Sequence, residues 1–157
     1  MIIGGYALPF YGRIRTTIDI DLAVVIKTEE EFKRLLELLR SENYEMSSTS
    51  STLILVLDCI EKIEMELWLK PDGITLDEET LKRRQKVKLD AKLWAWIISA
   101  EDFIVNKLAR PDRGAIDEQD VKSVLIRQKD HLDYIYLEKR AKEAGVFTVL
   151  QTIQRLP

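Results

Sequence analysis

Runs of apolar residues along the chain predict strands in its first two thirds. Some of these runs alternate with polar residues at every second position, as in a half-buried strand, and one is continuously apolar, as in a strand buried on both faces. Ser/Thr-rich or Pro-Gly stretches bound several of them. The predicted strands cover residues 17–25, 53–57 and 63–69.

Between and after these strands, apolar residues recur at helical spacing. Thr28 and Glu31 form a capping box at the start of a predicted helix over 28–44. Ser99 and Asp102 form a second capping pair, and from there to the end of the chain the patterns are helical. The later helices are expected over 117–128, 132–144, where Gly145 stops the helix, and 147–156.

Three segments separate these elements. The serine-rich residues 46–52 break the periodicity and are expected to form a loop. Pro71, Asp72 and Gly73 are typical of a chain-reversing turn. Residues 86–99 hold two short β-like runs and predict a hairpin, although residues 93–98 also fit the start of a helix.

Strands early and helices late indicate an α+β fold with a small mixed sheet, flanked by helices, and a C-terminal helix cluster. A chain of 157 residues can bury a core of ordinary size. We therefore expect one domain over 1–157, with the sheet and a metal site in 1–98 and a helical part in 99–157.

The strand over 17–25 carries the first candidate chemistry. Its alternation places Ile18, Ile20 and Leu22 on one face and the carboxylates of Asp19 and Asp21 on the other. Two carboxylates so close repel each other unless a cation neutralises them. Mg²⁺ takes oxygen ligands and often keeps positions for substrate phosphates, so a divalent-metal site is predicted here. The alternative is a strand end with two aspartates facing solvent.

Gly4 and Gly5 point to a phosphate site beside those acids. They follow a short apolar strand and precede Tyr6, a plausible helix start, so backbone N–H groups can approach an anion there. The residues between this turn and the acids add cations and hydroxyl groups: Arg13, Arg15, Thr16 and Thr17.

Charge and composition narrow the classes of function. The net charge of −3 argues against a broad, sequence-independent grip on nucleic acid. A local basic patch at residues 82–88 is still possible, although such a run is more often a solvated face. The single cysteine, Cys59, has an apolar setting that favours a buried thiol. We expect a cytoplasmic protein with no membrane segment and no export signal.

The segment GGYALPFYGRIRTTIDIDL, residues 4–22, resembles the nucleotidyltransferases of the DNA polymerase β superfamily. Their signature is Gly-Gly or Gly-Ser, a short helix, and then Asp-x-Asp on a strand. The variant is similar to a small branch that includes AbiEii-type toxins. Residues 99–125, SAEDFIVNKLARPDRGAIDEQDVKSVL, resemble the second block of that branch. Only three residues precede the Gly-Gly turn, fewer than in these relatives, so either the start is truncated or the site is reduced.

The resemblance implies a third carboxylate on a neighbouring strand, which assists the metal or takes a proton. Glu64 and Glu66 share the polar face of residues 63–69, and Glu66 fits the family pattern better. The resemblance also implies that Lys107 points at a triphosphate. A lysine at the edge of the core, with no part in binding, explains its position in the sequence equally well. Asp117 and Asp120 are expected to cap and orient the following helix. The tryptophans at 68, 94 and 96 are expected in the core or at interfaces.

The resulting hypothesis is Mg²⁺- or Mn²⁺-dependent transfer of NMP from an NTP to a hydroxyl of RNA, protein or a small molecule. Asp19, Asp21 and Glu66 would hold the metal, and Gly4, Gly5, Arg15, Thr17 and Lys107 would bind the nucleotide. The alternative is a catalytically weak nucleotide-binding module with a cognate partner protein, as in a toxin and antitoxin pair.

Overall fold

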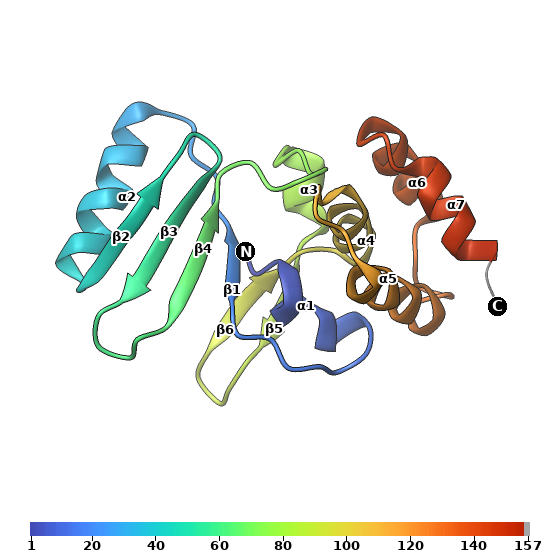
Figure 1. Ribbon diagram of the computed structural model, residues 1–157, viewed down its shortest axis with the longest axis horizontal. Helices are drawn as coiled ribbons and strands as arrows, with labels where there is room; N and C mark the ends of the chain where they lie inside the picture. The colour runs from blue at the N-terminus through green and yellow to red at the C-terminus, as the bar shows by residue number, and fades with distance from the viewer. Residues whose placement is uncertain (156–157) are drawn as a thin grey trace.

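A computed structural model describes residues 1–155 of the protein and shows the expected α+β architecture (Figure 1). A four-stranded sheet has the order β1-β4-β3-β2. β1 and β4 are parallel and the other pairs are antiparallel, so the sheet is mixed, as predicted. The strands are β1 (Ile20–Ala23), β2 (Tyr44–Thr49), β3 (Leu53–Asp58) and β4 (Glu64–Trp68).

Helix α2 (Glu29–Ser41) covers one face of this sheet. Thr28 caps it as predicted, because its hydroxyl accepts from the backbone N–H of Glu31 and the Glu31 carboxylate returns to the backbone of Thr28. The helix ends at Ser41, before the predicted 44. A small core forms between helix and sheet from Leu39, Ile54, Val56 and Leu67.

Strands β5 (Gln85–Lys88) and β6 (Trp94–Ile97) form an antiparallel hairpin, which confirms the hairpin over 86–99 against a helix at 93–98. Ile2 connects this hairpin to the larger sheet. It bridges Leu22 of β1 on one side and Ile97 of β6 on the other. The start of the chain thus lies between the two sheets (Figure 1).

A helix cluster packs beside the sheets and encloses the larger core, which includes Leu8, Ile97, Phe103 and Leu137. Ser99 caps α4 (Ala100–Ala109), the central helix of this cluster, because its hydroxyl accepts a hydrogen bond from the backbone N–H of Asp102 at 3.1 Å. None of the helices in residues 1–155 combines the length and apolar composition that crossing a bilayer requires. The helices are α1 (Gly4–Tyr11), α3 (Glu78–Arg83), α4 (Ala100–Ala109), α5 (Ala115–Arg127), α6 (Tyr134–Glu143) and α7 (Phe147–Arg155).

Two predicted boundaries were wrong. The serine-rich stretch from Met46, predicted as a loop, belongs largely to β2, which ends at Thr49. Backbone pairing with β3 makes it a strand, although its polar side chains favour a loop. β1 is shorter than predicted and starts at Ile20. Ile18 is 83% exposed, so the apolar face of the predicted strand does not extend to it. The predicted end of the last helix, at Leu156, lies outside the described residues.

Two expectations of burial differ from the structure. Trp94 and Trp96 on β6 are exposed and not part of the core, so the core was wrong for them and an interface stays a prediction. Cys59 is half-buried. Asp117 does cap its helix as predicted, since its carboxylate accepts from the backbone N–H of Gly114 at 3.1 Å.

Candidate active site

Two carboxylates lie side by side on the sheet face opposite α2. Asp21 of β1 and Glu66 of β4 are direct partners in the parallel register. In-register residues point to the same face, so both carboxylates project to one side. Burial, followed by the charge of Asp21, raises the pKa of Glu66 above its ordinary value. This pair is the acidic part of the site.

Trp68 links the two carboxylates. It follows Glu66 by two positions on β4 and therefore shares its face. Its indole N–H donates to Glu66 Oε2 at 3.0 Å and to Asp21 Oδ1 at 3.3 Å. A single donor shared between two acids fixes their orientation but does not neutralise their charge.

Gly4 makes room for the Asp21 carboxylate. A Cβ built on Gly4 would overlap Asp21 Oδ2, and Gly4 has φ +61°, a conformation that favours glycine. The first residue of α1 therefore lies against the acid pair. Gly5 is similarly close to Thr17, whose Oγ1 would be 2.5 Å from a Cβ at that position.

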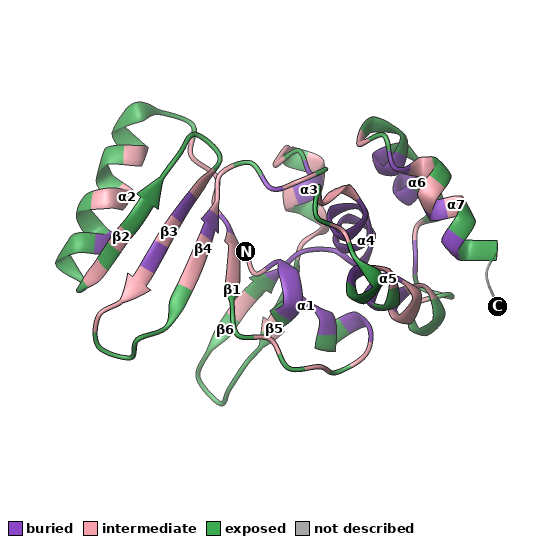
Figure 2. Cartoon of the chain, viewed as in Figure 1, coloured by how far each residue is buried: buried purple, intermediate pink, exposed green. Residues whose placement is uncertain are grey.

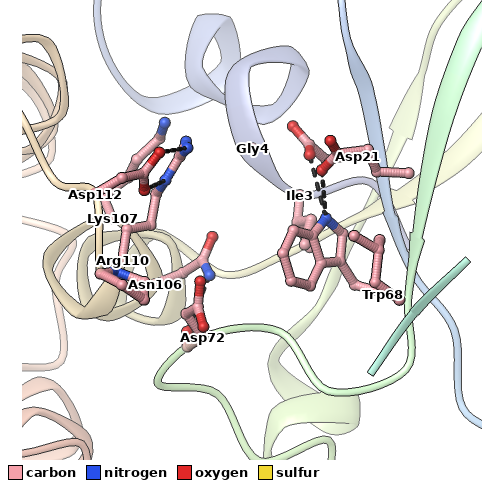
Figure 3. A pocket seen from close by; sticks show the side chains of 12 residues that line it. Ile3, Gly4, Asp21, Trp68, Asp72, Asn106, Lys107, Arg110 and Asp112 are labelled. Carbon is pink, nitrogen blue, oxygen red and sulfur yellow. Dashed lines mark hydrogen bonds and ion pairs between the residues drawn. The ribbon is translucent and has the colours of Figure 1, made fainter. Parts of the chain in front are cut away.

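A cavity of about 410 Å³ opens between the acid pair and the helix cluster (Figure 3). Asp21 and Trp68 lie on one side of it and Lys107, Arg110 and Asp112 on the other. Its lining is Ile3, Gly4, Asp21, Leu53, Glu66, Trp68, Asp72, Asn106, Lys107, Arg110, Pro111 and Asp112. The cavity thus has an acidic wall from the sheet and a basic wall from the end of α4.

Arg110 is the more accessible cation of the basic wall. Its Nη2 lies 2.9 Å from Asp112 Oδ2, and its side chain is 41% exposed. The hydrogen bond with Asp112, followed by the charge of Asp117, raises the pKa of Arg110, and the charge of Asp21 across the cavity adds a smaller rise.

Lys107 borders the cavity but is held by acids behind it. It is 2% exposed, and its Nζ donates to Asp117 Oδ1 at 2.9 Å. Although burial opposes the change, the hydrogen bonds from Lys107 and from the backbone of Gly114 lower the pKa of Asp117. Asp120, whose side chain is fully buried, lies 3.8 Å from Lys107 Nζ.

The same Asp120 also binds Arg15, which therefore does not line the cavity. Arg15 Nε donates to Asp120 Oδ2 at 3.1 Å, and Arg13 Nε donates to Asp120 Oδ1 at 2.9 Å. Gly5 and Thr17 lie outside the lining as well. Of the residues predicted to bind nucleotide, the structure brings Gly4 and Lys107 to the cavity.

Asp19 lies in the segment just before β1 and is exposed. It borders a second, smaller hollow of about 230 Å³ over β3 and β4, together with Glu64 and Glu66. Glu66 therefore borders both hollows, with Asp21 on one side and Asp19 on the other. The register places Glu66, not Glu64, opposite Asp21.

The acid pair suits a metal that needs few protein ligands. Among residues 1–155, no three side chains of the types Asp, Glu, His and Cys are arranged to hold one ion. Mg²⁺ commonly uses one or two carboxylates and completes its shell with water and substrate phosphates. Asp21 and Glu66, which repel each other and point into a polar cavity, fit such a site.

Sequence reasoning missed several lining residues, namely Asp72, Asn106, Arg110 and Asp112. Trp68 was expected in the core or at an interface, although its position two residues after Glu66 on one strand already placed it beside the acids. Arg110 follows directly after α4, two residues before Asp112, and nothing in that spacing indicates a shared cavity with Asp21. Asn106 holds the 71–73 turn, since its Nδ2 donates to the carbonyl of Asp72 at 2.9 Å.

Comparison with known proteins shows the family of the chain. No curated protein matches the chain. One family model matches residues 1–155, and its description is nucleotidyltransferase of unknown function (DUF6036). The match includes the glycine turn, the acid pair and the basic wall. The chain therefore belongs to this family of nucleotidyltransferases.

Proposed function

We propose that the protein is a metal-dependent nucleotidyltransferase that transfers an NMP group from an NTP to a hydroxyl. The observation that carries this proposal is the cavity with carboxylates on one wall and cations on the other. A nucleoside triphosphate bound with a divalent cation needs both, because its phosphates are anionic and the ion needs oxygen ligands.

Asp21 and Glu66 would hold Mg²⁺ or Mn²⁺. Asp19 lies at the second hollow, which Glu66 also borders, and is not arranged with this pair to hold the same ion. The bound ion would stabilise negative charge on the reacting phosphate oxygens. Trp68 orients both carboxylates through its shared N–H. Gly4 lets the start of α1 lie against Asp21, so backbone N–H groups of that helix start would lie near phosphates bound beside the acid pair.

Arg110 already donates from Nε and Nη2 to Asp112, so the β and γ phosphates would bind its remaining N–H groups or replace Asp112. Lys107, which is paired with Asp117, borders the same site. In the reaction the acceptor oxygen attacks the α-phosphorus, the bond to the bridging oxygen breaks, and pyrophosphate leaves with that electron pair. One oxygen of the Glu66 carboxylate would hold the ion, and the other would take the proton of the attacking hydroxyl.

The decisive experiment is label transfer from α-labelled NTPs in the presence of Mg²⁺ or Mn²⁺, with total RNA, protein or small alcohols as acceptors. Wild-type protein should transfer label. Asp21→Asn should reduce transfer by about a hundredfold or more, because it removes a metal-binding charge. Glu45→Gln on β2, an exposed acid outside the cavity, is the matched control and should leave transfer unchanged. Absence of transfer with every nucleotide, metal and acceptor would contradict the proposal.

Measurements of metal binding and of nucleotide binding test the acidic and the basic wall independently. Calorimetric titration with Mn²⁺ should show binding to the wild type and loss of it in Asp21→Asn. Arg110→Ala should weaken NTP binding about tenfold by loss of charge-assisted hydrogen bonds, with an unchanged unfolding temperature. Arg34→Ala, an exposed arginine on α2, is the control. Lys107→Ala is a poorer test, because it breaks the buried ion pair with Asp117 and would therefore also destabilise the fold.

A second candidate is a catalytically weak nucleotide-binding module that acts with a cognate partner, as in AbiEii-type toxin pairs. The observation that favours it is the neutralisation of Lys107 and Arg15 by Asp117 and Asp120. That pairing leaves Arg110 as the more accessible cation at the cavity. Binding of Mn²⁺ and NTP without label transfer would support this candidate over the enzyme.

A further inference from the structure

The β5–β6 hairpin presents a face of alternating tryptophan and lysine that the proposed active site does not use. In its antiparallel register Lys86 is paired with Trp96, and Lys88 with Trp94. Paired residues share a face, so these four side chains lie together. The other face, with Val87 and Ile97, belongs to or packs against the larger core.

The two tryptophans are unusually accessible for their size. Trp94 is 53% exposed and Trp96 is 40% exposed, and most of the hairpin around them is exposed too (Figure 2). Lysines on β5 have an ordinary explanation, because charged side chains on an edge strand prevent pairing with other chains. That explanation does not account for two large aromatic rings across from them, which would be expected to bury their area unless a ligand covers them.

Cations already lie over the rings. The guanidinium of Arg84 is 4.3 Å from the ring centroid of Trp96, and Lys86 Nζ is 5.7 Å from that of Trp94. Such cation–π pairs place positive charge and a flat apolar surface at the same point. Nucleic acid presents the complementary pair, an anionic phosphate next to a flat base.

The charge of the hairpin is opposite to that of the whole chain. Residues 84–96 contain four cations and one acid, Asp90, while the chain has a net charge of −3. The preceding residues Lys82 and Arg83 pair with Glu78 and Asp133. The four cations of the hairpin form no ion pair within residues 1–155: Arg84, Lys86, Lys88 and Lys92.

We propose that this face, formed by Arg84, Lys86, Lys88, Trp94 and Trp96, binds a single-stranded segment of RNA. Bases stack on the indole rings in place of the cations, which move from the ring faces to the phosphates. Trp94 and Trp96 are two residues apart on one strand, so their rings can take neighbouring bases. Duplexes hide the faces of their bases, whereas loops and ends of RNA leave them open for stacking on aromatic or arginine side chains.

The binding does not depend on catalysis. The bound RNA would also supply the acceptor hydroxyl, a step that rests on the proposed function. RNA binding and nucleotidyl transfer can therefore be disproved independently. Asp21→Asn should bind RNA as the wild type does while it loses transfer, and a hairpin variant should lose RNA while it still binds Mn²⁺ and NTP.

The test is fluorescence anisotropy of labelled 12-nucleotide oligo(U) and oligo(A) RNA, the matching DNA and an RNA duplex, with the full chain at low salt. Trp94→Ala/Trp96→Ala should weaken RNA binding about fivefold to a hundredfold, and Trp94→Phe/Trp96→Phe should largely restore it. Tyr134→Ala, an aromatic residue on α6 with 40% exposure, is the matched control. Because the substituted rings are exposed, unfolding temperatures should stay close to wild type.

Salt dependence tests the charges independently. Lys86→Gln/Lys88→Gln should reduce the slope of log K against log salt by about 1.4, since two phosphate contacts are lost. Lys33→Gln/Arg34→Gln on α2 changes the net charge equally and should not alter the slope. The inference is overturned if the wild type binds no RNA, if duplex RNA or DNA is preferred to single-stranded RNA, or if the alanine variant binds as the wild type does.

Discussion

The acidic wall of the cavity stands on two adjacent strands, whereas the basic wall stands on the end of a helix. On the strands, backbone register alone places Asp21 beside Glu66. At the helix, the positions of Lys107 and Arg110 depend on ion pairs with aspartates from the following loop and from α5. The comparison shows that one half of the site is set by local backbone geometry and the other by ion pairs, of which that between Lys107 and Asp117 is buried.

Among the residues that hold the basic wall, Asp120 is the one whose substitution should destabilise the protein most. This carboxylate is fully buried and lies within 4 Å of Arg13, Arg15 and Lys107. We expect Asp120→Ala to lower the free energy of unfolding by about 3 kcal/mol, because it removes the buried carboxylate that Arg13 and Arg15 share. Lys107 keeps its partner Asp117 in this variant. Denaturant unfolding measures this loss.

The control for that variant is Asp112→Ala on the same wall. Asp112 pairs with Arg110, but its side chain is 71% exposed, so the change should be less than about 1 kcal/mol. Equal losses in the two variants would contradict the view that burial makes the basic wall depend on Asp120.

The acidic wall is most sensitive at Gly4, where backbone and carboxylate meet. Gly4→Ala should lower the free energy of unfolding by about 2–3 kcal/mol, because it combines a positive φ with overlap of the Asp21 carboxylate. Gly145→Ala isolates the first effect. Gly145 also has a positive φ, +72°, but a Cβ added there would meet no atom within 4 Å, so its loss should be about 1 kcal/mol.

Thermal unfolding of both glycine variants provides the measurement. A loss at Gly4 no greater than at Gly145 would show that Asp21 adapts to the added methyl group. The acidic wall would then be less rigid than the register suggests.

The smallest expected effect concerns pH and Glu66. Its pKa is raised in the folded protein, mainly by burial and then by Asp21. The folded state therefore holds a proton that the unfolded state has already lost, and stability falls as pH rises from the ordinary glutamate pKa through the raised value. Glu66→Gln should be more stable than wild type at pH 7 and should lose this advantage at pH 4.

Unfolding temperatures of wild type and Glu66→Gln at the two pH values test this, in the absence of divalent metal. Added Mn²⁺ should remove the difference at pH 7 by stabilising only the wild type, since a metal ligand must be deprotonated. A Glu66→Gln variant that is less stable than wild type at pH 7 without metal would contradict the sign of the pKa shift.

The contrast between the walls also explains what the sequence could predict. Alternation of apolar and acidic residues identified the strands of the acid pair, because that inference needs only local geometry. The family resemblance, not the alternation, ranked Glu66 above Glu64. The shorter β1 and the strand at Met46 were missed, since pairing with neighbouring strands decides where a strand begins.

The basic wall could not be derived in the same way. The helix carrying Lys107 was predicted, but its lysine pairs with Asp117 at the border of the cavity, and Arg110, which was not predicted, lines the cavity beside it. Those outcomes depend on how α4 packs against α1 and α5. No periodicity within a single segment contains that information.

The ion pairs of Asp120 with Arg13 and Arg15 also affect the order in which the molecule folds. These contacts join positions 107 and 105 residues apart in the chain, across the segment that leads into β1. Contacts over such distances form slowly, because a long loop must close before they stabilise anything. We expect the edge of the sheet near Asp19 to become ordered only after α5 docks, so that the hairpin of β3 and β4 is complete while the site beside it is still open.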